Sequence, residues 1–395
     1  MDRLTLRGGR VIDPSQGIDG AFDLTIEGDR IASLEPSGAV PPEPGERAED
    51  VSGLLVVPGL IDLHGHWYEG SPYGLDPKAN LRGGVTTAVD AGTAGFSNFG
   101  EFRRHTIEVA PIRVLAFVHV AAGGLVTTVV GELEDLRYAR PRETAAIARD
   151  HRDVVVGVKV RLGRGACGDN VDAALGAALE AARLAATPLM AHIAEGADVR
   201  AALTRLRPGD IVTHAFTASG PGILGEDGRV LPEAHDAHRR GVRFDVGHGC
   251  GSFSWQTAAV ALSEGLAPDA ISTDLHRYSI ERPVVDLPTT MSRYLALGLS
   301  LGEVVTAATS GPASILGRPE LGTLRPGAPA DVSVLRLEET PVELADAQGV
   351  RRHVPSRLVP VVTIAAGAIH WAAEVELRLR PYLDADREVD CATPI

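Results

Sequence analysis

Two rhythms of apolar and polar positions divide the chain. From about residue 3 to residue 52, short runs such as L-T-L-R and D-L-T-I-E alternate apolar and polar residues between turn signals. This alternation is typical of small antiparallel β-structure. The same pattern returns from Leu321, in L-G-T-L-R-P-G-A-P-A-D-V-S-V-L and V-V-T-I-A-A-G-A-I-H-W. We therefore expect residues 1–54 and 321–395 to pair into a small β-sandwich side domain.

Residues 55–320 follow the other rhythm, in which apolar runs of strand length alternate with longer helical stretches rich in Ala, Leu, Arg and Glu. Such an alternation predicts an α/β domain with a parallel sheet covered by helices. Eight units over roughly 250 residues favour a closed (β/α)8 TIM barrel. An open doubly wound sheet is the alternative, disfavoured because no G-x-G-x-x-G follows a strand. The expected strands are Leu54–His64, Val85–Ala91, Arg113–Ala121, Val154–Leu162, Pro188–Ala194, Asp210–Phe216, Val242–Val246 and Ala270–Asp274.

Polar residues stand at or just beyond the ends of most of these runs. Barrel enzymes carry their chemistry at the carboxyl ends of the strands, so residues far apart in sequence are expected to meet at one mouth. The residues in question are His64, His66, Asp90, His119, Lys159, His192, His214, His248 and Asp274.

The first of these ends reads V-V-P-G-L-I-D-L-H-G-H, from Val56 to His66. Residues two apart in a strand point to one face, roughly 6.5–7 Å apart, so His64 and His66 can aim at one point. Imidazole suits zinc and similar divalent metals. An H-x-H pair also arises by chance, and only its company in the barrel makes it a metal-site prediction.

Charge and leader patterns narrow the class. Lys and Arg number 38 against 52 Asp and Glu, a formal charge of −14, and no basic cluster stands out. This disfavours nucleic acid as a partner. The chain begins without a basic segment and apolar core, and no apolar run is long enough for a bilayer, so we expect a cytoplasmic protein without membrane contact. Three scattered cysteines, Cys167, Cys250 and Cys391, fit a reducing compartment.

Four further residues qualify as metal ligands, each with a plainer alternative. Lys159 lies in V-V-V-G-V-K-V-R-L and is either a salt-bridged core lysine or a carboxylated ligand. His192 and His214 end consecutive strands, where a single histidine is more often a hydrogen-bonded core residue. Asp274 either caps a helix or binds metal and moves a proton.

An H-x-H pair follows a P-G-x-I-D strand, and a strand lysine, two strand histidines and a late aspartate come after it. In this order of residues the chain resembles the two-metal amidohydrolase superfamily. The later L-R-P-G-A-P-A-D is similar to the returning β-domain of that superfamily. The resemblance implies two zinc ions, a bridging carboxylated Lys159, a bridging hydroxide nucleophile and a homo-oligomer. It implies His64 and His66 on one ion, His192 and His214 on the other, and Asp274 as ligand and general base, then acid.

Within the superfamily the chain resembles the dihydroorotase- and hydantoinase-like group, and most of all bacterial deacetylase-like metallohydrolases. The motifs are G-V-K-V-R-L, F-D-V-G-H-G-C-G-S-F-S-W and S-T-D-L-H. True dihydroorotases carry an arginine shortly after H-x-H, where this chain has W-Y-E-G. The resemblance implies hydrolysis of acetyl esters of R-configured α-hydroxy acids, such as acetyl-(R)-mandelate, or of N-acyl amino acids.

Substrate contacts are expected from four residues around the mouth. Arg161 shares a strand face with Lys159 and can pair with a substrate carboxylate, although an arginine paired at the rim is an equal alternative. His248 and Ser252 lie in a Gly-rich loop that permits close backbone approach to a ligand. Tyr68 completes the set. We expect Asp90, His119 and His276 to support ligands and Cys250 to be a small buried thiol.

Three functions follow for testing. The leading hypothesis is a dinuclear-zinc hydrolase of a small acyl ester or amide that carries a carboxylate. The alternative is ring opening of a cyclic amide at the same site, as in a hydantoinase or dihydroorotase. A non-catalytic scaffold derived from such an enzyme is disfavoured because no ligand of the motif is missing.

Overall fold

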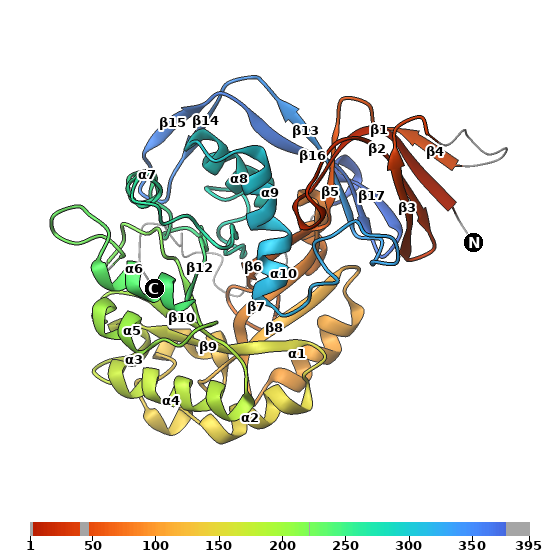
Figure 1. Cartoon of the computed structure of the whole chain (residues 1–395). Coiled ribbons are helices and arrows are strands. Elements are labelled where there is room, and N and C mark those ends of the chain that lie inside the picture. The colour runs from red at the N-terminus through yellow and green to blue at the C-terminus, as the bar shows by residue number, and fades with distance from the viewer. Residues whose placement is uncertain (1–2, 40–46, 221, 377–395) are drawn as a thin grey trace.

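The computed structural model describes residues 3–39, 47–220 and 222–376. Its centre is a parallel sheet of seven strands in the order β12-β11-β10-β9-β8-β7-β6 (Figure 1). These strands are β6 Leu60–Gly65, β7 Val85–Gly95, β8 Arg113–His119, β9 Val155–Leu162, β10 Leu189–Ile193, β11 Ile211–Thr213 and β12 Arg243–Phe244. Their order follows the chain, as the predicted barrel requires.

The eighth predicted run, Ala270–Asp274, closes the curved sheet through isolated bridges instead of a regular strand. Ala270 pairs in parallel with Asp245 beyond β12, and Leu275 pairs in parallel with Gly65 on β6. The amide of Asp274 donates to the carbonyl of His64 at 2.7 Å. The sheet is therefore a TIM-like barrel whose last edge is short and irregular.

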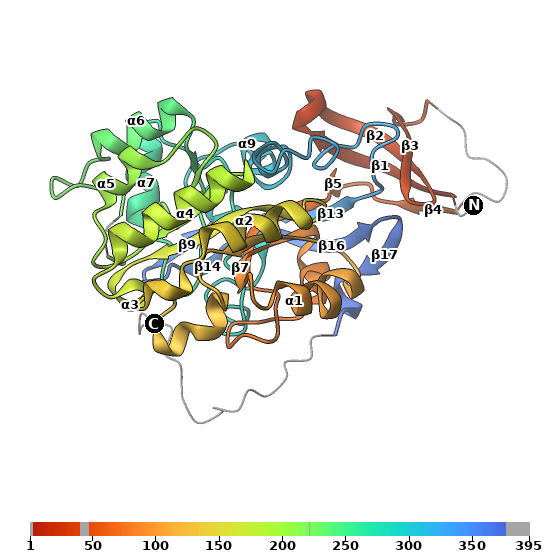
Figure 2. The ribbon, with the colours of Figure 1, turned by 90° about the horizontal axis from the view of Figure 1, so that it is seen from below.

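Helices cover the outside of the barrel, and α2 and α4 lie side by side over β9 (Figure 2). The longest, α4, buries Ala174, Ala178, Ala181 and Ala182, a spacing that places small residues on one helical face against the sheet. No helix in the described part of the chain is long and apolar enough to cross a membrane. The helices are α1 Phe99–His105, α2 Pro141–Asp150, α3 Arg164–Cys167, α4 Val171–Ala185, α5 Val199–Arg205, α6 Pro232–Arg240, α7 Trp255–Ser263, α8 Leu287–Ala296, α9 Leu301–Ala308 and α10 Ser310–Ile315.

Strands from both ends of the described chain share a second sheet beside the barrel, in the order β17-β16-β13-β5-β1-β2-β3 with β4 on β1 (Figure 1). A separate hairpin, β14–β15, extends from the returning segment. The two ends thus meet in one sheet, whereas a β-sandwich remains a prediction and residues 377–395 lie outside the described part. The strands are β1 Arg3–Asp13, β2 Ile18–Glu27, β3 Arg30–Pro36, β4 Arg47–Asp50, β5 Leu55–Pro58, β13 Val332–Glu338, β14 Val342–Ala345, β15 Arg351–Val354, β16 Arg357–Ala365 and β17 Ala368–Trp371.

The single strand expected over Leu54–His64 is wrong, because the chain changes sheets at Gly59. β5 before it pairs with β1 and β13, while β6 after it begins the barrel. A Cβ at Gly59 would lie 2.1 Å from Thr86 Oγ1 and 2.9 Å from Asp331 Cβ, so only glycine fits this crossing. Residues 55–58, which the sequence assigned to the barrel, therefore belong to the sheet of the chain ends.

Candidate metal centre

Three predicted ligands meet at the mouth of the barrel. His64 ends β6, His66 follows it, and Asp274 lies on the closing segment, with one donor atom from each within 4.8 Å of the others. Asp274 Oδ1 lies 3.1 Å from His66 Nε2 and 3.4 Å from His64 Nε2. This oxygen is buried and has no hydrogen-bond partner among the described residues. A carboxylate oxygen facing two imidazole nitrogens in this way fits a divalent cation between them.

A threonine fixes the tautomer of His64. The Thr213 hydroxyl lies 2.7 Å from His64 Nδ1 and donates its own hydrogen to Asp245 Oδ2, also at 2.7 Å. Because a hydroxyl has one hydrogen, Thr213 must accept from His64 Nδ1–H. The lone pair of His64 is then on Nε2, the nitrogen that faces Asp274. Burial also lowers the pKa of His64 well below its ordinary value, which keeps the ring neutral as a ligand must be.

His66 is supported in the same manner from β7. Its Nδ1 lies 2.8 Å from Thr93 Oγ1, and the amide of Thr93 donates to Asp90 at 2.7 Å. Asp90 also accepts from the amide of Trp67 at 2.8 Å. The structure thus places Asp90 behind His66, whereas Thr93, Thr213 and Asp245 were not among the predicted site residues.

Lys159 and two further histidines adjoin this group. The Lys159 side chain is buried, with Nζ 3.5 Å from His64 Nε2, and burial lowers the pKa of its amine to about 8. His214 donates from Nδ1 to the Gly247 carbonyl at 2.7 Å, which leaves its Nε2 unprotonated. The ring of His214 lies 4.2 Å from that of His192 and 4.8 Å from that of His64, centre to centre. All six predicted ligands therefore converge.

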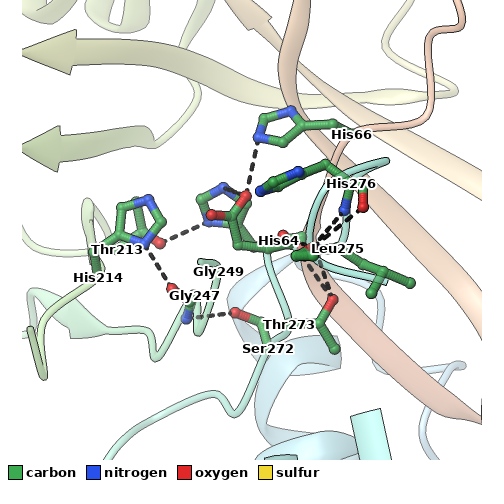
Figure 3. A network of polar contacts seen from close by, with 12 residues as sticks. His64, His66, Thr213, His214, Gly247, Gly249, Ser272, Thr273, Leu275 and His276 are labelled. Carbon is green, nitrogen blue, oxygen red and sulfur yellow. Dashed lines mark hydrogen bonds and ion pairs between the residues drawn. The ribbon is translucent and has the colours of Figure 1, made fainter. Parts of the chain in front are cut away.

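The Gly-rich loop after β12 packs on the ligands themselves. His214 and Asp274 have φ angles of 59° and 49°, which are strained for residues with side chains. A Cβ at Gly249 would lie 2.3 Å from Asp274 Oδ2, and a Cβ at Gly247 2.6 Å from Thr213 Oγ1. Figure 3 shows Gly247 linked to both His214 and Ser272. These glycines allow the backbone of the loop to pack closely against Asp274 and Thr213. The sequence had predicted that the same loop approaches a substrate.

His248 and Ser252 occupy the same loop in different surroundings. The buried His248 ring stacks on Phe253 at 4.9 Å and donates from Nδ1 to the Gly249 carbonyl. The amide of Ser252 donates to the His248 carbonyl, and the residue is half-buried. His248 thus lies in an apolar layer, and its substrate role remains a prediction.

A tyrosine other than the predicted one faces the centre. Tyr68 packs on Phe102 of α1, with ring centres 5.3 Å apart. Tyr73 instead lies 5.9 Å from the ring of His66 and 5.5 Å from that of His276, and burial raises its pKa to about 12. Both tyrosines follow H-x-H in a loop, where no periodicity tells which one turns inward.

His119 and His276 flank the group. His119 Nδ1 accepts from the amide of Ala121 at 3.0 Å, so Nε2 carries the proton, and this buried atom has no partner in the described structure. The ring of His276 lies 6.2 Å from that of His66. Arg161, two residues beyond Lys159 on β9, donates a hydrogen bond to Glu132 at 2.7 Å. Glu132 was not among the predicted site residues.

The barrel and the convergent His, Lys and Asp side chains define a metal-dependent hydrolase. The chain belongs to the Amidohydrolase family, whose profile matches residues 55–359. The predicted family resemblance is thereby confirmed.

Relatives in this family have several names. The chain is 34% identical over 331 residues to Deacetylase Atu3266 of Agrobacterium fabrum, covering 83% of this chain and 81% of that protein. A crystal structure of a dihydroorotase is similar with a TM-score of 0.88 and 31% identity, over 94% of this chain and 98% of that one. A crystal structure of an adenine deaminase is similar with a TM-score of 0.86 and 30% identity, over 93% and 99%.

Proposed function

We propose that this enzyme is a dinuclear-zinc hydrolase that removes an acyl group, such as acetyl, from a small ester or amide bearing a carboxylate. The observation that carries the proposal is the buried, unpartnered Asp274 oxygen between the Nε2 atoms of His64 and His66. The similarity to a named deacetylase over most of the chain supports the acyl substrate.

In this proposal His64, His66 and Asp274 would hold one ion, and His192 and His214 would hold the other. Lys159 would be a further ligand as a carbamate, formed when its neutral amine attacks carbon dioxide and loses a proton. Its lowered pKa favours the neutral amine that this attack requires. Two bound ions would lower the pKa of a water molecule between them and polarise the scissile carbonyl.

Asp274 is the proton carrier. Its Oδ1 atom faces the centre without a hydrogen bond from the described residues, so this oxygen can take a proton from the attacking water and deliver it to the leaving oxygen or nitrogen. Gly249 packs against the other carboxylate oxygen and limits the movement of the side chain.

A substrate panel tests the reaction. O-acetyl-(R)-mandelate and its S form, N-acetyl amino acids of both hands, and cyclic imides would be assayed side by side with zinc-loaded enzyme. Turnover of the acetyl compounds supports the proposal. Turnover of cyclic imides alone would contradict the proposal. It would support the ring-opening alternative, which agrees with the similarity to the crystal structure of a dihydroorotase.

The role of Asp274 is tested by Asp274→Asn. We expect a loss of turnover of at least about 10³-fold, since the carboxylate is both base and acid. Asp236→Asn, on the exposed face of α6, is the matched control. Zinc content is measured on both proteins, and a variant that keeps two zinc ions and most activity would show that Asp274 does not carry the proton.

The side domain and the oligomer belong to the same proposal. The sheet of the chain ends has its own apolar cluster, including Leu6, Leu24, Val56, Val334 and Ile364, which supports a unit distinct from the barrel. We propose a homo-oligomer from family membership. Sedimentation of the purified protein would reveal a monomer if this is wrong.

A further inference from the structure

A half-buried arginine and a buried glutamate form an ion pair next to the candidate metal centre. Arg161 lies two residues beyond Lys159 on β9, and its Nη1 donates to Glu132 Oε1 at 2.7 Å. Glu132 is 1% exposed and lies in the loop between β8 and α2. The single hydrogen of the Thr128 hydroxyl is shared between the Leu125 carbonyl, at 2.8 Å, and Glu132 Oε1, at 3.1 Å. Two elements of the barrel mouth are thus joined by a charge-assisted hydrogen bond.

Arg161 lies beside a candidate ligand on the neighbouring strand. It pairs in register with His192 of β10 and shares its face of β9 with Lys159, two residues before it. Tyr73 borders the same centre, with its ring 5.9 Å from that of His66 and 5.5 Å from that of His276. Arg161 and Tyr73 therefore both lie at the end of the barrel where the candidate ligands converge.

We propose that Glu132 is the positioning residue for Arg161, and that the pair with Tyr73 forms a subsite for the substrate carboxylate. This inference rests on the proposed function and specifies its substrate class. A long arginine side chain loses rotamer freedom when it binds a substrate, and a fixed partner removes that freedom before the substrate arrives. A planar guanidinium can also serve two carboxylates through different edges.

Glu132 also balances the charge of the half-buried Arg161 cation. An unpaired guanidinium beside two metal ions would add a third source of positive charge, whereas the Glu132–Arg161 pair is neutral. Selectivity for a carboxylate substrate then comes from the fixed direction of the Arg161 N–H donors. The substrate carboxylate brings a second negative charge to the guanidinium. A purely structural pair, joining the loop to β9, would affect charged and uncharged substrates equally.

The experiment compares Glu132→Gln with Glu134→Gln, an exposed glutamate two residues further along the same loop. The substrates are O-acetyl-(R)-mandelate and its methyl ester, which lacks the carboxylate. For Glu132→Gln we expect KM for the carboxylate substrate to rise about tenfold with kcat within about twofold, because the loss of the fixed guanidinium orientation outweighs the stronger attraction of an Arg161 charge that Glu132 no longer balances. KM for the methyl ester should stay unchanged, as should both constants of Glu134→Gln.

Binding keeps the test independent of turnover. Calorimetric titration of (R)-mandelate into zinc-loaded wild type and Glu132→Gln should show the same tenfold loss of affinity even if the hydrolytic proposal fails. Arg161→Gln serves if Glu132→Gln does not fold, with the same expected loss. Equal KM changes for the two substrates, or unchanged (R)-mandelate binding in the folded variant, would overturn the subsite.

Discussion

Thr213→Val removes the hydroxyl that fixes His64 while keeping the shape of the side chain. In the native protein this hydroxyl accepts from His64 Nδ1 and donates to Asp245 Oδ2, both at 2.7 Å. The variant leaves two buried polar atoms without these bonds, and each such loss costs about 1–3 kcal/mol. His64 is then free to take the other tautomer, with the proton on Nε2, the nitrogen that faces Asp274 and would bind the metal.

The magnitude for metal binding follows from this support. Loss of a hydrogen-bonding group behind a histidine ligand typically weakens metal affinity by about 10–100-fold, or about 1.4–2.8 kcal/mol. We expect Thr213→Val to lose affinity in this range for the ion held by His64. Competition with a chromophoric zinc chelator, together with metal content, measures it.

Two companion variants sharpen the result. Thr213→Ser restores the hydroxyl and should recover most of the affinity, whereas Thr93→Val should weaken binding at His66 in the same way. If Thr213→Val binds zinc as tightly as wild type, or if Thr213→Ser is no better than Thr213→Val, the hydroxyl does not set the tautomer.

Two further predictions concern Tyr73 and Cys167. Tyr73→Ala should raise KM up to about tenfold, since an aromatic contact contributes about 0.5–1.5 kcal/mol. Tyr68→Ala should leave KM unchanged and lower the melting temperature. The reverse pattern would show that Tyr68, and not Tyr73, contacts the substrate. Burial raises the pKa of the Cys167 thiol from 9.0 to about 11, so the folded chain keeps a proton between pH 9 and 11 that the unfolded chain releases. The stability that this group contributes is present below pH 9 and is lost as pH rises to 11. Urea unfolding at both pH values should show that the free energy of unfolding falls by about 2–3 kcal/mol less in Cys167→Ala than in wild type. An identical fall in both proteins would contradict the shift.

The barrel and its candidate ligands could be predicted from the sequence, because the barrel follows from the periodicity of apolar residues and the candidate ligands from their position at strand ends. A parallel strand exposes its chemistry at its carboxyl end, so His64, Lys159 and His192 could be placed together before any coordinates existed. The hydrophobic pattern was misleading at Gly59, because the apolar run continues there although the chain crosses from one sheet to the other.

The supporting residues were not predictable in this way. Thr213 and Asp245 are ordinary polar residues near strand ends, and their relation to His64 depends on the spacing of neighbouring strands. Glu132 and Tyr73 lie in loops, whose direction no periodic pattern records. The Gly-rich loop was predicted to approach a ligand closely, and the structure shows Gly249 packed against Asp274, a neighbour that the sequence could not identify.

The sheet change at Gly59 has a consequence for the order of folding. The strand that carries His64 is held at its start by the Gly59 amide, which donates to the Asp331 carbonyl at 2.8 Å. Val332, the next residue, pairs with Pro58 across the same crossing. Closing a chain segment of this length costs loop entropy before the contact contributes any stability. On a ribosome, residues 331 and 332 are synthesised after every unit of the barrel, so the start of the strand that carries His64 is held only once the whole barrel sequence has been made.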